Sequence, residues 1–189
     1  MKKATHGSKI VMKLSCTAVL YLALTEAVVA EVPTRSPHPA SDHVTLCGLL
    51  QLKREFQRAI EHCQAVLKVN ATDAQALSNR GSAHLSLGNL DMAMHDFDAA
   101  IAVAPKDASY IFNRALVHSA KGQHDRAITD YDTVIRLMPG LAIAYNNRGR
   151  EFELLGERDR AIADYRKALS VDPSLTIIAR NLRRLGIEP

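Results

Sequence analysis

The sequence predicts an all-α solenoid, built from stacked pairs of antiparallel helices and closed by a C-terminal helix. Two observations carry this prediction. Residue types recur at an interval of 34, without a gap, from residue 74 to residue 173. Each period also places small residues, a glycine, an aromatic residue and a proline in the same order. A fixed period of this length is typical of stacked helical repeats, which offer a surface rather than a catalytic pocket.

The recurring residues account for each element of one unit. Small residues are needed where two helices approach closely, and aromatic side chains fill the space beside them. A glycine can end the first helix in a left-handed conformation, an aspartate suits the start of the second helix, and a proline ends it. The rows are Gly81/Ala115/Gly149, Ala93/Ala127/Ala161, Ala100/Val134/Ala168, Phe97/Tyr131/Tyr165, Gly88/Gly122/Gly156, Asp91/Asp125/Asp159 and Pro105/Pro139/Pro173.

Through these residues the chain resembles the tetratricopeptide repeat family, whose helix–turn–helix unit spans 34 residues. Three good copies cover residues 74–107, 108–141 and 142–173. The resemblance implies a tetratricopeptide-type α-solenoid of antiparallel helix pairs with a C-terminal capping helix. The repeat domain is expected over residues 42–185.

A degenerate copy precedes the good ones at residues 40–73. Its departures from the pattern are expected, because terminal repeats of such arrays are often atypical. Arg54 stands there in place of the turn glycine, and Ala71 in place of the proline. At the other end, residues 175–185 predict one amphipathic capping helix. Its apolar side carries Leu175, Ile178, Leu182 and Leu185.

The first thirty residues predict a signal peptide. Four lysines precede an apolar run from Leu14 to Leu24, and the small residues Val28 and Ala30 favour cleavage after Ala30. The run is short for a membrane span, and an uncleaved anchor is the competing interpretation. Residues 31–41 contain three prolines and predict a flexible segment. We therefore expect a periplasmic or secreted protein without a membrane contact after cleavage.

The charge of the chain argues against nucleic acid as a partner. The whole chain holds 24 basic and 20 acidic residues, a net charge of +4. The leader contributes four lysines and one glutamate, so the remainder has 20 basic and 19 acidic residues. No basic stripe with interleaved aromatic residues remains. Nucleic acid is therefore an unlikely partner, and a protein or peptide partner is what the resemblance to the repeat family implies.

Cys47 and Cys63 are expected to face each other across the first, degenerate hairpin. In an oxidising compartment such a pair predicts a disulfide. The loop would span 16 residues, worth about 3 kcal/mol in the loop-entropy account. Two buried thiols are the alternative. One free, acidic thiol would instead allow an enzyme with thiol chemistry, the least favoured class.

The sequence predicts no metal site, no cofactor and no enzymatic activity. His84 and His118 share one row and could suggest a metal, but packed neutral histidines are favoured, because no third ligand follows at metal spacing. Paired carboxylates, a nucleophile elbow and a phosphate-binding glycine loop are absent from the sequence. Each unit also predicts an Arg–Asp ion pair, within the unit or between neighbours, from Arg80/Arg114/Arg148 and Asp96/Asp130/Asp164.

The resemblance places a peptide-binding groove along the first helices, on the concave face. Asparagines there would bond the main chain of a ligand, since an amide both donates and accepts, or would satisfy neighbouring backbone instead. Apolar side chains would anchor the ligand. The candidate residues are Asn79, Ser82, Phe112, Asn113, Leu116, Ile143, Asn146, Asn147 and Arg150.

A monomeric, non-catalytic module that binds a peptide or protein partner is the function expected from these observations. The alternative is a structural solenoid that self-assembles into a scaffold through its open ends.

Overall fold

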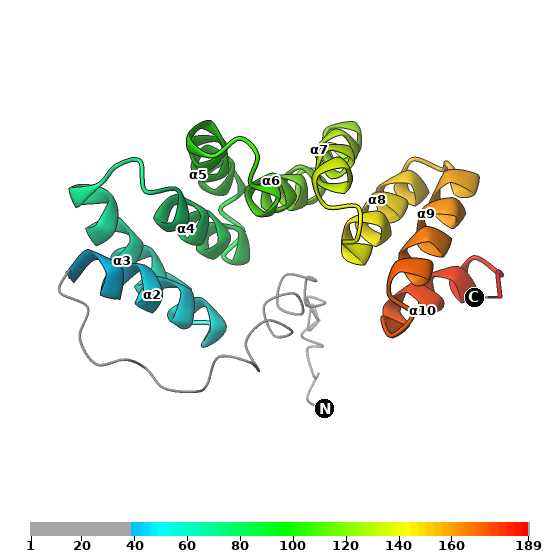
Figure 1. Ribbon diagram of the computed structural model, residues 1–189, viewed down its shortest axis with the longest axis horizontal. Helices are drawn as coiled ribbons and strands as arrows, with labels where there is room; N and C mark the ends of the chain where they lie inside the picture. Colours follow the sequence, from blue (N-terminus) through cyan, green and yellow to red (C-terminus); the bar gives the residue numbers. More distant parts are fainter. Residues whose placement is uncertain (1–38, 189) are drawn as a thin grey trace, which may run out of the picture. The chain divides into compact units, whose positions relative to one another are not determined.

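The computed structural model describes residues 39–188, and the side chains of residues 44–188. The predicted signal peptide 1–30 and residues 31–38 lie outside the described residues. Within residues 39–188 every regular element is a helix, which confirms the predicted all-α fold (Figure 1). The helices are α2 (Pro39–Leu52), α3 (Phe56–Val69), α4 (Ala74–Ser86), α5 (Leu90–Val103), α6 (Ala108–Ala120), α7 (His124–Leu137), α8 (Ala142–Leu154), α9 (Arg158–Val171) and α10 (Thr176–Arg184).

The start of α2 differs from the sequence prediction. This helix begins at Pro39, so the last three residues of the segment predicted as flexible, 39–41, are helical. Proline is compatible with the first turn of a helix because it needs no hydrogen-bond donor there. The capping helix α10 falls within the predicted range 175–185, and Ile178 and Leu182 on its apolar side are fully buried.

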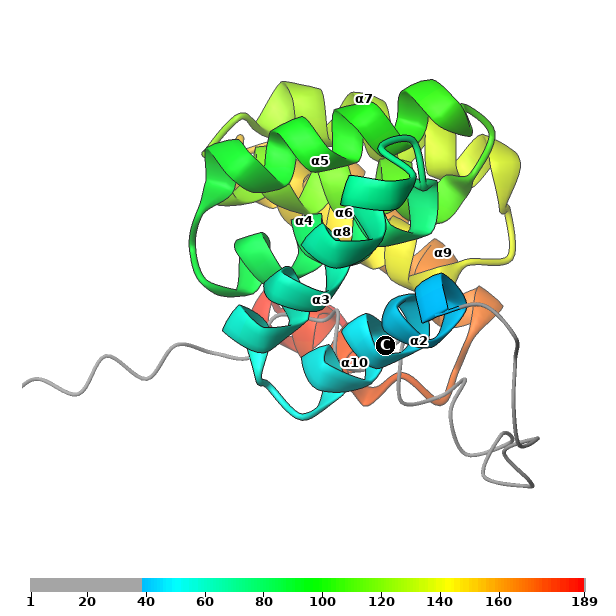
Figure 2. The same ribbon diagram turned by 90° about the vertical axis from the view of Figure 1, so that its left-hand side faces the viewer.

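Helices pair in sequence order, and the pairs stack side by side in the described unit. Each first helix contacts its own second helix, and each second helix contacts the first helix of the next pair; α2 also contacts α4, and α4 contacts α6. Figure 2 shows α5 and α7 at the top of this unit, with α4, α6 and α8 below them. We call the side formed by α2, α4, α6, α8 and α10 the first-helix face.

Four turns between paired helices share one geometry. Gly88, Gly122 and Gly156 have φ values of 80°, 70° and 79°. The residue after each turn glycine donates its backbone N–H to a carbonyl five positions earlier, as in Asn89 to His84 at 2.9 Å. The degenerate hairpin makes the same bonds, with Arg54 at a φ of 60°. Arg54 therefore adopts a left-handed conformation that glycine adopts without steric cost.

The predicted close contact between paired helices is confirmed. A Cβ atom added at Gly81 would lie 3.0 Å from the ring of Phe97 and 3.2 Å from Cβ of Asp96. A Cβ atom at Gly149 would meet Tyr165 and Asp164 at 3.1 Å. The aromatic side chains and the small residues facing them are fully or almost fully buried. This contact is the centre of each helix pair.

The predicted Arg–Asp pairs form both within and between units. In each good repeat an arginine donates two hydrogen bonds, 2.6–2.9 Å long, to the carboxylate of an aspartate on the following helix. The pairs are Arg80–Asp96, Arg114–Asp130 and Arg148–Asp164. Arg114 and Arg148 also reach back to the preceding unit. Their second partners are Asp98 and Asp132. The bonds to Asp130 and, less strongly, to Asp98 raise the pKa of Arg114, so this guanidinium stays charged at any physiological pH and can link two repeats.

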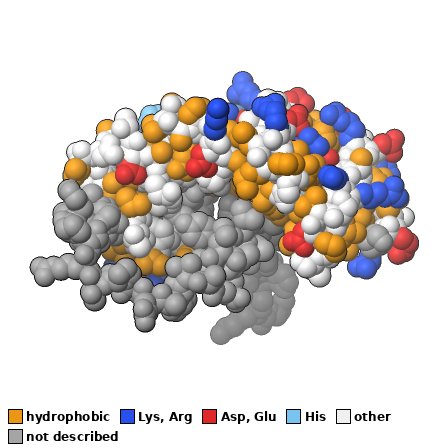
Figure 3. Space-filling model, viewed as in Figure 1, with side chains coloured by type: hydrophobic (Ala, Val, Ile, Leu, Met, Phe, Trp, Pro, Cys, Tyr) orange, Lys and Arg blue, Asp and Glu red, His pale blue; other side chains and the backbone are white. Residues whose placement is uncertain are grey.

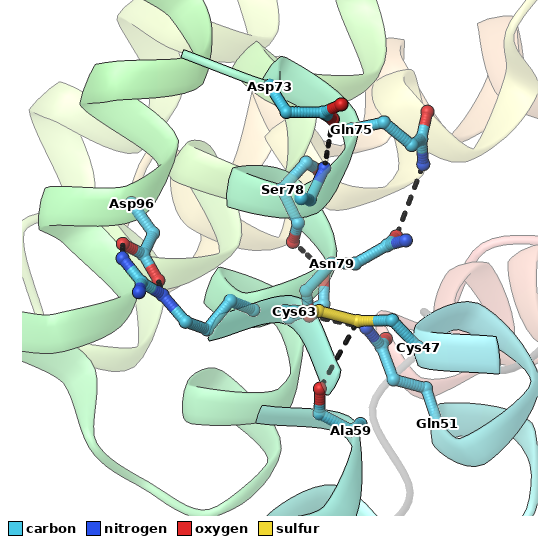
Figure 4. Close-up of a disulfide and its surroundings, with 12 residues drawn as sticks. Cys47, Gln51, Ala59, Cys63, Asp73, Gln75, Ser78, Asn79 and Asp96 are labelled. Carbon is cyan, nitrogen blue, oxygen red and sulfur yellow. Dashed lines mark hydrogen bonds and ion pairs between the residues drawn. A yellow bond between two sulfur atoms is a disulfide. The ribbon is translucent and has the colours of Figure 1, made fainter. Parts of the chain in front are cut away.

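Figure 4 shows the first hairpin, where the sulfur atoms of Cys47 and Cys63 are joined. Their Cα atoms lie 5.7 Å apart, within the range of natural disulfides. Both residues are fully buried, and Leu50, Ala59 and Ile60 surround them. The predicted pairing is therefore geometrically feasible in this fold.

The left-handed turn at Arg54 leads to a stability prediction. Arg54→Gly should raise the free energy of unfolding by about 1 kcal/mol, because a side chain in this conformation costs roughly that amount. Arg54 is exposed, so few contacts are lost. Urea unfolding followed by circular dichroism would measure the change.

The matched control is Gly122→Arg, which places the same side chain in the equivalent turn. Nothing lies within 4 Å of a Cβ atom at Gly122, so the expected loss is conformational and of similar size. Equal stability of wild type and the Arg54→Gly variant would show that the turn of the first hairpin carries no conformational cost.

Candidate functional site

The nine candidate residues all lie on α4, α6 and α8, three helices of the first-helix face, but they differ in exposure. Phe112, Ile143 and Asn146 are 4%, 6% and 4% exposed, and Asn79 and Asn147 are also buried. Ser82, Asn113 and Leu116 are half-buried, and Arg150 is exposed. A ligand would therefore meet the last four side chains before the others. Figure 3 shows the surface of the described residues from one side, with apolar and charged side chains interspersed.

Phe112 belongs to the packing of the second unit. Its ring meets that of Tyr131 edge to face, with centroids 5.7 Å apart. Tyr131 lies on α7, so this contact joins the two helices of one pair. The predicted role of Phe112 as a ligand anchor has no support in this packing, whereas Leu116, one turn further along α6, keeps part of its surface free.

The buried asparagines satisfy one another and neighbouring side chains. Gln75 donates to Oδ1 of Asn79 at 3.2 Å, and Gln51 of α2 donates to the backbone oxygen of Asn79 (Figure 4). Asn146 donates to Oδ1 of Asn147 at 3.1 Å. The bond from Gln51 joins adjacent units through the backbone of Asn79. The amides of Asn79 and Asn147 instead bond side chains of their own helices, which is neither of the two roles considered in the sequence analysis.

Asn113 differs from the other asparagines of its row. Among the described residues no hydrogen-bond partner faces its amide, although it lies between the bonded Asn79 and Asn147 in the periodic row. The neighbouring Ser82 donates to the backbone oxygen of Ser78 at 2.9 Å. The middle of the first-helix face thus presents one amide able to donate and accept, beside the partly exposed Leu116.

Sequence reasoning missed Asn181 on α10. Its Nδ2 donates to Oδ1 of Asn146 at 2.9 Å. The signal was present, since Asn181 follows Asn147 by 34 residues and continues the row of Asn79, Asn113 and Asn147. The same interval relates Asp98 to Asp132, the second partners of the bridging arginines.

A buried carboxylate at the junction of the second and third units was also missed. Glu151 on α8 is 1% exposed. Ser119 donates to one of its oxygens at 2.6 Å, and Nδ1 of His124 lies 2.7 Å from the other. The carboxylate therefore holds the turn of one unit against the first helix of the next. The serine and the histidine contact opposite oxygens, so this is not the Ser–His–carboxylate relay of a hydrolase.

The paired histidines behave differently from each other. Nδ1 of His118 lies 2.7 Å from Oε1 of Gln123, whereas both ring nitrogens of His84 are buried without a partner. Repeat 74–107 has Asn89 at the position of Gln123 in repeat 108–141. The side chain of Asn89 is one methylene shorter than that of Gln123. Burial lowers the pKa of His84, the charge of Asp96 opposes this effect, and the charge of Arg80 adds to it.

The described part of the chain contains neither a cluster of metal ligands nor an accessible cysteine. No group of three or more His, Cys, Asp or Glu side chains there is arranged to hold a metal ion. Cys47 and Cys63 are fully buried, so a substrate would not reach their sulfur atoms. Across residues 39–188 no helix has the length and apolar character of a membrane span.

Comparison with models of protein families shows to which family this chain belongs. Models described as tetratricopeptide repeat match residues 74–107, 108–140 and 142–175, more than half of the chain. The chain belongs to the tetratricopeptide repeat family. The matched ranges begin at the same residues as the three copies predicted from the sequence. A comparison with curated protein sequences finds no significant match.

Solved structures of similar fold support the same assignment. Two crystal structures of MamA have 28% and 26% identity, with TM-scores of 0.66 and 0.67. They cover 72% and 82% of this chain, which in turn covers 75% and 86% of theirs. TTC0263, a thermophilic tetratricopeptide repeat protein of Thermus thermophilus, has 23% identity and a TM-score of 0.68, with 78% of this chain and 83% of its own covered.

Membership of this family implies a module for protein–protein interaction or scaffolding, and the fold is typically non-catalytic. The surface of the repeats, rather than an enclosed pocket, is therefore where the function of this chain is to be sought.

The unpartnered His84 leads to a prediction on stability and pH. His84→Phe, which copies Phe152 of the third unit, should stabilise the fold by about 1–3 kcal/mol, because it removes buried polar atoms without partners. In the wild type, the unfolded chain takes up a proton at this histidine near pH 6.5, whereas the folded chain resists it. Stability from this residue is therefore lost as the pH falls below about 6.5.

Urea unfolding at pH 7.5 and pH 5.5 would measure both effects. The gain from His84→Phe should be larger at pH 5.5, and His118→Phe, which breaks the bond to Gln123, serves as the control. A pH-independent difference between wild type and His84→Phe would contradict the assigned protonation behaviour.

Proposed function

We propose that the first-helix face binds an extended segment of a partner protein, with Asn113 and Leu116 at the centre of the binding surface. The proposal is based mainly on the amide of Asn113, which has no hydrogen-bond partner among residues 39–188, in a row whose other members are bonded. An amide can donate to and accept from peptide main chain at once. Leu116 adds apolar surface one turn away, and Ser82 and Arg150 flank this centre on α4 and α8.

The buried members of the predicted site support this surface from behind. Asn79 and Asn146 accept bonds from Gln51 and Asn181 on adjacent first helices, and Asn147 accepts from Asn146. Phe112 and Ile143 fill the space beneath. This arrangement keeps the exposed side chains on rigid helices, and preorganisation of this kind lowers the entropic cost of binding.

The proposal includes an exported location, in the periplasm or outside the cell. It rests on the leader predicted over residues 1–30 and on the buried pair Cys47–Cys63, whose Cα atoms are close enough for a disulfide. Disulfides persist in oxidising compartments and are rare in the cytosol. Within such a compartment the chain would act as a non-catalytic adaptor.

One observation favours a second function, self-assembly. Leu46, Leu49 and Leu52 of α2 are 37%, 48% and 41% exposed, at the open first end of the array. Exposed apolar side chains on a terminal helix can pack against another copy. Light scattering of the exported protein over a range of concentrations tests this function, because a concentration-dependent mass supports assembly and a constant monomer mass excludes it.

Affinity capture from the native exported fraction tests the binding proposal. The double variant Asn113→Ala with Leu116→Ala should lose a partner that the wild type retains, by about tenfold or more in recovered amount, because both central contacts are removed. Phe112 is left intact, since its loss would weaken the fold. Circular dichroism would establish equal helicity before the comparison.

The matched control is Met92→Ala with Thr129→Ala, which removes one apolar and one polar exposed side chain from α5 and α7. This pair should retain the partner. Equal capture by wild type and the Asn113/Leu116 variant would place the binding surface elsewhere on the molecule.

A thiol count tests the location and the disulfide together. The exported protein, denatured without reductant, should react with a thiol reagent at neither Cys47 nor Cys63, and at both after reduction. Reduction should also lower the free energy of unfolding by about 3 kcal/mol. Two reactive thiols in the unreduced protein would show that the first hairpin is held by packing alone.

A further inference from the structure

The helix α10 continues the repeat period. The first helices α4, α6 and α8 begin at Ala74, Ala108 and Ala142, and α10 begins at Thr176, each 34 residues after the last. It has nine residues where the others have thirteen, because Gly186 turns the chain earlier, with a φ of 72°. It therefore has the place and phase of the first helix of a truncated further unit, and it extends the first-helix face.

The bond from Asn181 to Asn146 fixes α10 beside α8 on this face. It is the counterpart of the contact that Gln51 of α2 makes with Asn79 at the opposite end. Ile178 and Leu182 are buried beneath it. The remaining side of α10, which carries Arg180 and Arg184 one turn apart, belongs to the extended face.

Positive charge gathers at this end. Arg184 donates to both oxygens of Glu153 on α8, which also accepts from Tyr165. Burial alone would raise the pKa of Glu153, but these bonds and the charge of Arg150 outweigh it, and the net pKa is lowered. Glu153 is thus held in its ionised form; it forms an ion pair with Arg184 and attracts Arg150 at longer range.

Three arginines of α8 and α10, Arg150, Arg180 and Arg183, are exposed and make no side-chain hydrogen bond or ion pair with a described residue. Arg150 feels only the longer-range charge of Glu153, and Arg183 occupies the repeat position of Gly149 rather than a position shared with Arg150 or Arg180. Arg150 occupies the same repeat position on α8 as Arg184 does on α10. Uncharged side chains occupy the corresponding positions of α4 and α6, which are Ser82 and Leu116 for Arg150 and Ser78 and Phe112 for Arg180.

We propose that α8 and α10 form a basic end of the binding face, which takes the Asp or Glu side chains of an extended partner segment through Arg150 and Arg180. This inference rests on the proposed function and adds the charge and direction of the ligand. The uncharged part of the segment lies over α4 and α6, where Asn113 bonds its main chain. The acidic part lies over α8 and α10, because unpaired guanidinium groups attract carboxylates through two parallel bonds.

Selection of random decapeptides, displayed within a phage coat protein so that neither end is free, tests this inference on the purified exported protein. The recovered peptides should be enriched in Asp and Glu. The best of them, synthesised with blocked ends, should bind Arg150→Gln with Arg180→Gln about tenfold more weakly than wild type. The matched control, Arg126→Gln with Arg166→Gln, removes the same charge from exposed sites of α7 and α9 and should leave affinity unchanged.

The outcomes separate the two proposals. Peptides without acidic enrichment, or equal weakening by both arginine pairs, would overturn the basic end. The binding face would still stand if Asn113→Ala with Leu116→Ala weakened the same peptides. Failure to recover any peptide would overturn both. In the synthetic peptide, Glu→Gln without effect, together with tight binding of a form with a free C-terminus, would assign the arginines to a terminal carboxylate instead.

Discussion

In each good repeat, the second helix lies against a position of the first helix that has room for little more than a hydrogen atom or a methyl group. At Gly81 the ring of Phe97 and the Cβ atom of Asp96 are both at contact distance from where a side chain would begin. The same approach brings the Asp96 carboxylate to the Arg80 guanidinium. The ion pair therefore depends on the close contact, because a wider helix pair would separate its two charges.

The degenerate first hairpin shows what replaces this contact when its residues are lost. Cys47 occupies the position of Gly81, and Cys63 occupies the position of Phe97. The joined sulfur atoms thus lie where the glycine and the ring meet in the other units. Leu46 and His62 stand in place of the arginine and the aspartate. A covalent link would compensate for the missing packing and charge in this unit.

Connections between units determine how the binding face is presented. Arg114 and Arg148 each join two second helices, while amides join adjacent first helices on the opposite side. Polar bonds therefore join neighbouring units on both sides of the stack, on the first-helix side at its two ends. A solenoid built in this way can bind an extended segment over several repeats, because neighbouring contacts fix their spacing.

The sequence by itself determined the helix pairs, their turns and their close contacts, because these depend on residues of one unit at fixed spacing. Gly88, Arg54 and the Arg80–Asp96 pair were all predictable in this way. Only the tertiary structure decided which first-helix residues remain accessible. Phe112 and Asn146 are buried by neighbouring helices, Asn113 has no partner in the described part of the chain, and α10 adds Asn181 to the face. Such outcomes depend on the packing between units and on the length of individual side chains. Gln123, for example, is one methylene longer than Asn89 and reaches the histidine of its unit. The repeat period predicts neither the packing between units nor these differences in length.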